Sequence, residues 1–187
     1  MAQGGRSGLQ RWRVPLGFLV VLSFLLLSSP TWSLIAIGLS ITLAGLALRG
    51  WASGHLRKNA ELAVTGPYAY TRNPLYFGSL LMTLGAAVSG GSAWLAAGLL
   101  SSFLLVYYPV MRSEADHMNG LFKGEYAKWA AQVPLFIPRL TPYRAGYHRC
   151  FERGLYVQHR EYQAFIGVAL IFAVLALKAG GYVRLGG

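Results

Sequence analysis

The sequence predicts an all-α integral membrane protein in which five helices cross the bilayer. The 187 residues are 55% hydrophobic, and the mean hydropathy is +0.43. Only 12% of the residues are charged, whereas soluble domains contain about 25%. Three stretches, residues 14–48, 73–111 and 162–177, contain no Asp, Glu, Lys or Arg. Since one span needs about 20 apolar residues, the first two stretches are each long enough for two helices.

The first pair of helices is expected over residues 14–29 and 32–48. Between them, a Ser-Ser-Pro-Thr sequence interrupts the apolar run. Proline fixes its own backbone and disfavours a helical conformation in the residue before it. A turn at this position therefore divides the stretch into two antiparallel spans.

The second pair is expected over residues 75–89 and 93–111, with a Ser-Gly-Gly-Ser turn between them, and a last helix is expected over 162–178. The helix over 75–89 is short and contains two glycines. A re-entrant segment at this place, which would leave four spans, is therefore the alternative. All of these helices belong to one expected domain that covers residues 1–187.

The formal net charge of +11 is distributed unevenly along the chain. Fifteen of the 17 basic residues fall before the first helix or in the connectors 49–73 and 112–161, whereas only Lys178 and Arg184 follow the last helix. By the positive-inside rule, the N-terminus and both connectors face the cytoplasm, and the C-terminus lies outside. Topology and attraction to anionic lipid explain the charge, so we expect no nucleic-acid partner. The composition fits a bacterial or archaeal inner membrane.

The connector 112–161 is predicted to contain two further helices. Residues 112–131 place apolar side chains at helical spacing, and two Xaa-Pro pairs within residues 133–138 end this helix. Residues 143–162 mix aromatic and charged residues, which is typical of an amphipathic helix that lies along the membrane surface.

All six acidic residues lie in the predicted cytoplasmic segments. Ionisable residues inside the membrane usually mark ion or proton pathways, so the sequence disfavours a pump, a channel and a proton-coupled transporter. The single cysteine and the four histidines show no metal-ligand spacing, and we expect no metal site. The functional groups should therefore lie at the cytoplasmic mouth of the bundle.

Two polar clusters can meet at that mouth. In residues 65–78, Arg72 precedes the third helix, and in residues 112–117, which follow the fourth helix, Glu114 is the first acid. Because these helices form an antiparallel hairpin, Arg72 and Glu114 are predicted to lie close together. Such a pair could bind a zwitterionic ligand through opposite charges, or it could be an ordinary interfacial salt bridge. Spacing alone leaves both interpretations open.

Several motifs follow one another along this part of the chain. They are Thr-Gly-Pro-Tyr at 65–68, Thr-Arg-Asn-Pro-Leu-Tyr-Phe-Gly at 71–78, Glu114, Leu-Phe-Lys-Gly-Glu-Tyr at 121–126, Val-Pro at 133–134 and Ile-Pro at 137–138. In this order, they resemble the isoprenylcysteine carboxyl methyltransferase and phospholipid methyltransferase family over residues 61–139. The His-Arg-Glu-Tyr sequence at 159–162 resembles the start of the last helix in bacterial members.

The resemblance implies an integral membrane methyltransferase that uses S-adenosylmethionine in a cytoplasmic pocket. A lipophilic acceptor would enter from the bilayer: a prenylcysteine-like carboxylate, a lipid amine or a small hydrophobic molecule. Carried over by position, the cofactor-binding residues are Gly66, Tyr68, Tyr70, Arg72, Asn73, Pro74, Tyr76 and Glu114. Arg72 and Glu114 are also the expected catalytic residues. Arg72 would orient a carboxylate of the acceptor or the cofactor, and Glu114 would hold the cofactor's amino group or ribose.

The sequence departs from the family pattern at two places. The second acid of the family's usual pair falls on Ala115, and the glycine that usually follows Phe122 is replaced by Lys123. Two alternatives therefore stand beside methyl transfer. One is a catalytically degenerate lipid-binding or scaffold protein on the same frame, and the other is a membrane sterol-type reductase that uses a nicotinamide cofactor. Cofactor affinity would distinguish the three.

Overall fold

The computed structural model describes residues 8–183, with side chains from residue 17 onward. Within these residues the chain forms six α-helices and one 3₁₀ helix, and it contains no strand. The elements are α1 (Gly8–Leu27), α2 (Trp32–Ser53), η1 (Gly66–Ala69), α3 (Pro74–Ser89), α4 (Ala93–Ala130), α5 (Arg153–Gln158) and α6 (Tyr162–Ala179). The predicted all-α class is confirmed.

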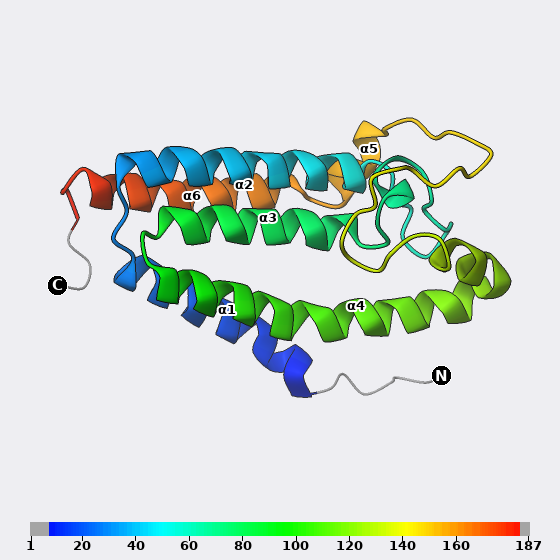
Figure 1. Ribbon diagram of the computed structural model, residues 1–187, viewed down its shortest axis with the longest axis horizontal. Helices are drawn as coiled ribbons and strands as arrows, with labels where there is room; N and C mark the ends of the chain where they lie inside the picture. Colours follow the sequence, from blue (N-terminus) through cyan, green and yellow to red (C-terminus); the bar gives the residue numbers. More distant parts are fainter. Residues whose placement is uncertain (1–7, 184–187) are drawn as a thin grey trace.

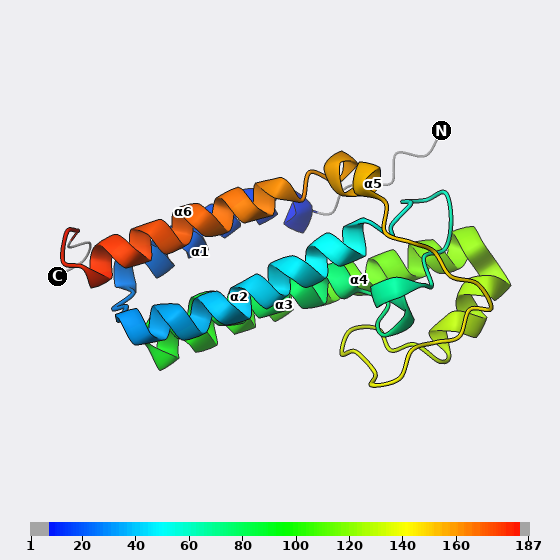
Figure 2. The same cartoon turned by 90° about the horizontal axis from the view of Figure 1, so that it is seen from above.

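The five long helices α1, α2, α3, α4 and α6 lie along the long axis of the molecule and alternate in direction (Figures 1 and 2). Contacts run from α2 to α3, α3 to α4, α4 to α1, α1 to α6 and α6 back to α2, so that the helices close into a ring. The connectors 54–73 and 131–161 lie together at one end of this bundle. We call it the connector end.

Helices α2 and α3 form the most extensive helix–helix interface in the bundle. A β-carbon at Gly45 would come within 2.6 Å of the Gly78 carbonyl oxygen, and one at Gly78 would come within 2.6 Å of Arg49 Cγ. Gly38 and Gly85 repeat this close approach farther along the two helices. Small residues let the backbones of two membrane helices approach closely. The glycines that make α3 a weak helix by itself therefore form its interface with α2.

Three helices, α2, α4 and α6, are long and apolar enough to cross a membrane. Helix α3 and the 17–27 part of α1 are shorter apolar helices. The number of five spans and their orientation therefore remain predictions.

Two ends of the predicted helices differ from those observed. Helix α1 begins at Gly8, so Arg11 and Arg13 lie within it and not before it, while Arg6 and Arg184 lie outside the described residues. Helix α2 continues past the predicted end at residue 48, which places Arg49 in its last turns. Both helices therefore extend beyond the charge-free stretch 14–48 into residues that carry charge.

Helix α4 continues from the predicted fourth span into the predicted helix 112–131 and bends at Lys123. Lys123 has φ 40° and ψ −118°, a conformation that glycine adopts readily and that residues with a β-carbon rarely adopt. Lysine stands here where the family pattern has glycine. Beyond the bend, Tyr126 and Trp129 pack with Tyr68 in a hydrophobic core at the connector end.

The predicted amphipathic helix over residues 143–162 is wrong for most of its length. Apart from α5, the chain before α6 is irregular here. Its backbone bonds to distant parts of the chain: Tyr143 N donates to Ala69 O at 2.8 Å, and Glu152 N donates to Gly54 O at 3.0 Å. These tertiary hydrogen bonds use donors that a helix would have used internally.

Candidate functional site

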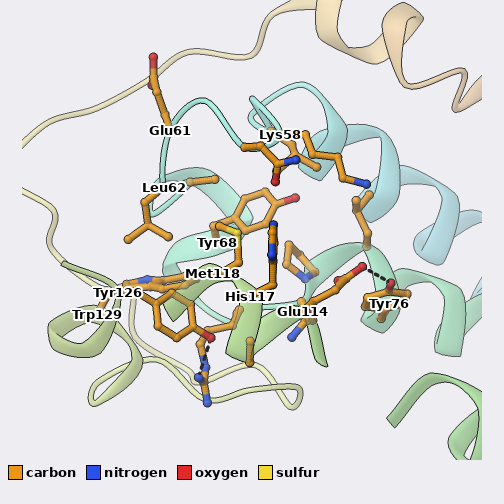
Figure 3. Close-up of a pocket in the computed structure, with 18 of the residues that line it drawn as sticks. Lys58, Glu61, Leu62, Tyr68, Tyr76, Glu114, His117, Met118, Tyr126 and Trp129 are labelled. Carbon is orange, nitrogen blue, oxygen red and sulfur yellow. Dashed lines mark hydrogen bonds between the residues drawn. The ribbon is translucent and has the colours of Figure 1, made fainter. Parts of the chain in front are cut away.

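A cavity of about 420 Å³ opens at the connector end, between η1, the start of α3 and the bent part of α4 (Figure 3). Small-molecule sites typically measure about 300 to 1,000 Å³. We call this space the first cavity. Besides residues predicted from the sequence, its wall includes Arg49, Lys58, Leu62, His117, Met118, Tyr126, Trp129 and His159.

The 3₁₀ helix η1 places Tyr68 in this wall. Pro67 lies in the first turn of η1, where a backbone N–H would have no partner within the helix, so proline loses no hydrogen bond there. Gly66 before it has φ +58°, and a β-carbon there would come within 2.6 Å of the His55 ring. Tyr68 is 6% exposed. Burial first, and then the negative charge of Glu114, raises the pKa of the Tyr68 hydroxyl, which stays protonated at neutral pH.

Hydrogen bonds attach residues 69–73 to the segment that follows α4. The bonds are Arg72 N to Pro134 O (2.9 Å), Arg139 N to Tyr70 O (2.9 Å), Thr71 Oγ1 to Phe136 O (2.7 Å) and Asn73 Nδ2 to Leu135 O (2.8 Å). They fix the backbone on both sides of Arg72. The side chain of Arg72 therefore projects from a segment whose backbone is held in place.

Arg72 and Glu114 both line the first cavity, as the hairpin arrangement predicts, but they form no ion pair with each other. Arg72 Nη1 donates a hydrogen bond to Tyr126 Oη at 3.1 Å. Tyr76 Oη donates to Glu114 Oε1 at 2.9 Å (Figure 3). Each of the two charged groups is hydrogen-bonded to a tyrosine hydroxyl, and the simple salt-bridge interpretation does not describe this site.

Six of the eight residues expected to bind the cofactor line the first cavity: Tyr68, Arg72, Asn73, Pro74, Tyr76 and Glu114. Gly66 and Tyr70 are not part of its wall. Gly66 faces His55, and Tyr70 contributes its carbonyl to the bond with Arg139. A role in ligand binding remains a prediction for all eight.

Two aromatic residues of the wall, Tyr126 and Trp129, are not predicted as site residues from the sequence. Trp129 is 3% exposed, and its Nε1 has no hydrogen-bond partner in the described part of the chain. Arg72 Nε is buried without a partner as well. Nearly all buried polar groups in proteins are hydrogen-bonded, and these two donors are exceptions in the described part of the chain. The sequence shows only a helical spacing of aromatics, which indicates an apolar face.

A partly buried ion pair joins three helices at the cavity. Arg49 Nε and Nη2 donate to the two carboxylate oxygens of Glu161 at 2.9 and 2.8 Å. Arg49 Nη1 donates to Ser79 Oγ at 2.5 Å and to Leu75 O at 3.3 Å. One guanidinium therefore connects the end of α2, the first turns of α3 and the residue before α6. In the sequence, Arg49 and Glu161 only flank apolar runs, and nothing predicts that they pair.

Within residues 17–183, no group of three or more His, Cys, Asp or Glu side chains is arranged to hold a metal ion. His117 and His159 line the first cavity together with Lys58 and Glu114. The wall thus combines charged groups of both signs, tyrosine hydroxyls and aromatic faces. A mostly apolar and aromatic wall with a few polar and charged groups is typical of a small-molecule site.

The chain matches the phospholipid methyltransferase family over residues 20–125. This region is more than half of the 187 residues, and it contains α2, η1, α3 and most of α4. The chain belongs to the phospholipid methyltransferase family. The family match confirms the resemblance seen in the sequence motifs, and it ends just before Tyr126 and Trp129.

Two curated proteins are similar to this family member. The cobalt-zinc-cadmium resistance protein CzcN of Cupriavidus metallidurans is 36% identical over 143 residues, which are 71% of this chain and 64% of that protein. The nickel-cobalt-cadmium resistance protein NccN of Alcaligenes xylosoxydans xylosoxydans is 35% identical over 144 residues, which are 72% and 66% of the two chains. The chain thus spans just under two thirds of the length of these relatives. Their names state metal resistance and specify no reaction. No solved structure matches the chain.

Proposed function

We propose that this family member transfers a methyl group from S-adenosylmethionine to a lipophilic acceptor in the first cavity. The observation that carries the proposal is the buried, unpartnered donor Trp129 Nε1 in the wall of a ligand-sized cavity that also contains Arg72 and Glu114. A buried donor without a partner costs about 1 to 3 kcal/mol. A bound ligand would recover this free energy, and family membership indicates which ligand to test first.

The chemistry of the wall fits S-adenosylmethionine. Glu114 can accept hydrogen bonds from the amino group or the ribose, and Trp129 Nε1 can donate to a ring nitrogen or a carboxylate. Tyr68 and Tyr126 contribute aromatic rings, and the face of such a ring attracts a cation such as a sulfonium. Arg72 would orient a negatively charged group, either on the cofactor or on the acceptor.

When bound, the cofactor supplies an electrophilic methyl group that the acceptor's nucleophile takes up as the carbon–sulfur bond breaks. The protein's contribution to such a displacement is alignment and the exclusion of water. Leu56, Leu62 and Met118 line the same cavity and would keep water out of it. A carboxylate acceptor needs no base. An amine must lose a proton, and His117 lies in the wall as a group that can accept one.

We infer that the connector end faces the cytoplasm, because most basic residues of the chain lie there. In this arrangement five helices, including the shorter α1 and α3, cross a bacterial or archaeal inner membrane. The acceptor is a prenylcysteine-like carboxylate, a lipid amine or a small hydrophobic molecule. Tyr76 of α3 and Tyr107 of α4, whose ring centroids lie 5.3 Å apart, border the cavity on the side of these two helices.

Calorimetric titration of the detergent-purified protein with S-adenosylmethionine and S-adenosylhomocysteine tests the proposal. We expect micromolar binding of at least one of them. Glu114→Gln and Trp129→Phe should each weaken it about tenfold, because each removes one hydrogen-bonding group that contributes about 1 to 1.5 kcal/mol. Trp94→Phe is the matched control, because Trp94 is 88% exposed on α4 and should not affect binding.

The outcomes separate the alternatives. If neither Glu114→Gln nor Trp129→Phe changes the affinity, the cofactor does not bind in the first cavity. A folded protein that binds NADPH and no S-adenosyl compound would be a reductase of the sterol type. A folded protein that binds lipid and neither cofactor would be the degenerate lipid-binding or scaffold protein.

A further inference from the structure

A second cavity of about 260 Å³ lies next to the first. It occupies the inside of the α4 bend, between residues 112–119 and residues 126–130 of the same helix. Three residues line both cavities: Arg72, Ala115 and Tyr126. The two spaces are therefore neighbours that share one wall.

In the shared wall, Arg72 has one buried nitrogen without a hydrogen-bond partner. Arg72 Nη1 is bound to Tyr126 Oη, and the Arg72 guanidinium lies 5.9 Å from the centroid of that ring. Arg72 Nε is buried and has no hydrogen-bond partner in the described part of the chain. The Nε and Nη2 groups form the edge of a guanidinium that binds a carboxylate or phosphate through two parallel hydrogen bonds. An oxyanion bound at this edge would give Arg72 Nε the hydrogen-bond partner that the described part of the chain does not provide.

A second arginine, Arg112 of α4, also lines the second cavity. Arg112 of α4 is exposed and forms no ion pair with any described residue. Asn119 adds an amide, and Asp116, one turn beyond Arg112, is the one acid in this wall. The charges that line the cavity, two arginines and one aspartate, leave it positive. A positive pocket with an unpartnered arginine edge favours an anionic ligand.

Ala115 explains why the protein itself does not supply the anion. Its methyl side chain faces both cavities, at the position where the family pattern has an acid. Glu114, the remaining acid of that pair, accepts its hydrogen bond from Tyr76 and not from Arg72. With alanine at this position, residue 115 places no carboxylate beside Arg72, and a ligand can supply a negative charge there.

We propose that the second cavity binds an oxyanion, a phosphate or carboxylate group, between Arg72 and Arg112. This inference rests on the proposed function. If the second cavity holds the charged group of the methyl acceptor, that acceptor is an anionic amphiphile whose reacting atom reaches the first cavity. The specificity determinants are then Arg112 and the absence of an acid at Ala115. Neither belongs to the residues assigned to the cofactor.

Titration calorimetry in a non-ionic maltoside detergent tests the site with three probes. Dioctanoyl phosphatidic acid carries a phosphate, dioctanoylglycerol has the same chains without it, and inorganic phosphate has no chains. We expect phosphatidic acid to bind at least about tenfold more tightly than dioctanoylglycerol, since charge-assisted bidentate hydrogen bonds are strong. If inorganic phosphate binds as tightly as phosphatidic acid, the oxyanion site stands and its ligand is a free anion rather than a lipid headgroup.

Ala115→Glu and Ala115→Gln form a matched pair of nearly equal size. Ala115→Glu places a carboxylate opposite Arg72 and should reduce the affinity for phosphatidic acid about tenfold, whereas Ala115→Gln should stay within about threefold of the parent. Arg112→Gln should weaken the binding of phosphatidic acid. It leaves the wall of the first cavity unchanged, because Arg112 lines only the second cavity. The proposal is overturned if Ala115→Glu and Ala115→Gln change the affinity equally, or if Arg112→Gln has no effect. It is also overturned if the charged and the uncharged lipid bind equally well.

Titration of the same variants with S-adenosylmethionine separates this proposal from the proposed function. Arg112 lines only the second cavity, so Arg112→Gln should bind the cofactor as the parent does. Cofactor binding without discrimination between the two lipids rejects the oxyanion site and leaves methyl transfer in place. Discrimination between the lipids without cofactor binding rejects methyl transfer and leaves the oxyanion site in place.

Discussion

Replacing Glu161 by glutamine would leave the Arg49 guanidinium without its counter-ion. The side chain of Glu161 is 8% exposed and that of Arg49 is 22% exposed, so water can replace little of the lost interaction. Both Arg49 nitrogens that face Glu161 bind it, at 2.8 and 2.9 Å. The remaining partners of Arg49 are the neutral oxygens of Ser79 and Leu75.

The size of the effect follows from this geometry. Removing one partner of a buried ion pair destabilises a protein by about 3 to 5 kcal/mol. We expect the lower end, about 3 kcal/mol, because Arg49 remains partly exposed and keeps two neutral acceptors. For a chain of this length, about 2 to 4 °C are lost per kcal/mol. Glu161→Gln should therefore unfold about 6 to 12 °C below the parent.

Circular dichroism at the helical minimum, recorded on heating the detergent-purified protein, measures this shift. Glu152→Gln is the matched control, because its ion pair with Arg57 is short, at 2.6 Å, but about two fifths of each side chain is exposed. Exposed ion pairs contribute little, so this control should unfold close to the parent. Equal shifts for Glu161→Gln and Glu152→Gln would refute the argument from burial. Replacing both Arg49 and Glu161 by apolar residues should recover part of the loss, since no charge then remains buried.

Two further predictions concern Lys123 and Tyr68. Lys123→Gly should stabilise the protein by about 1 kcal/mol, because the strain of a positive φ, about 1 to 3 kcal/mol, exceeds the entropic cost of glycine, about 0.5 to 1 kcal/mol. Lys123→Ala keeps the β-carbon and should show no such gain in thermal unfolding. An equal gain for the two variants would contradict the strain argument. Because burial raises the pKa of Tyr68, the folded protein keeps the hydroxyl proton above about pH 10, where the unfolded chain loses it. Relative to Tyr68→Phe, the parent should therefore lose about 1.4 kcal/mol of stability per pH unit above about pH 10, and parallel unfolding curves of the two proteins from pH 8 to 11 would contradict this.

Much of the fold can be predicted from local sequence. The Ser-Ser-Pro-Thr and Ser-Gly-Gly-Ser turns divide the apolar runs where the structure ends α1 and α3, because proline and glycine interrupt helices through their own backbone geometry. The irregular chain at 143–152 could not be predicted in this way. Its mixture of aromatic and charged residues also suits an amphipathic helix, and only its hydrogen bonds to Ala69 and Gly54 decide otherwise.

The candidate site is likewise predicted in part from local sequence and determined in part by tertiary contacts. Motif order indicates Arg72, Tyr76 and Glu114, and the structure brings all three to one cavity. Their partners depend on side-chain positions that spacing does not determine. Arg72 bonds to Tyr126, which lies beyond the bend of α4 at Lys123, and spacing along the sequence does not reveal that bend.

The sequence by itself determined the helical class, the order of the long helices and the family, because hydropathy, turn residues and short motifs are properties of local sequence. The tertiary structure decided which charges pair and which do not. Arg49 binds Glu161 across 112 positions of the chain, whereas Arg72 Nε and Trp129 Nε1 are left without partners. Pairing of this kind depends on how whole helices pack, and the free energy of a buried charge depends on every element around it. The cavity walls that carry the proposals therefore exist only in the folded chain.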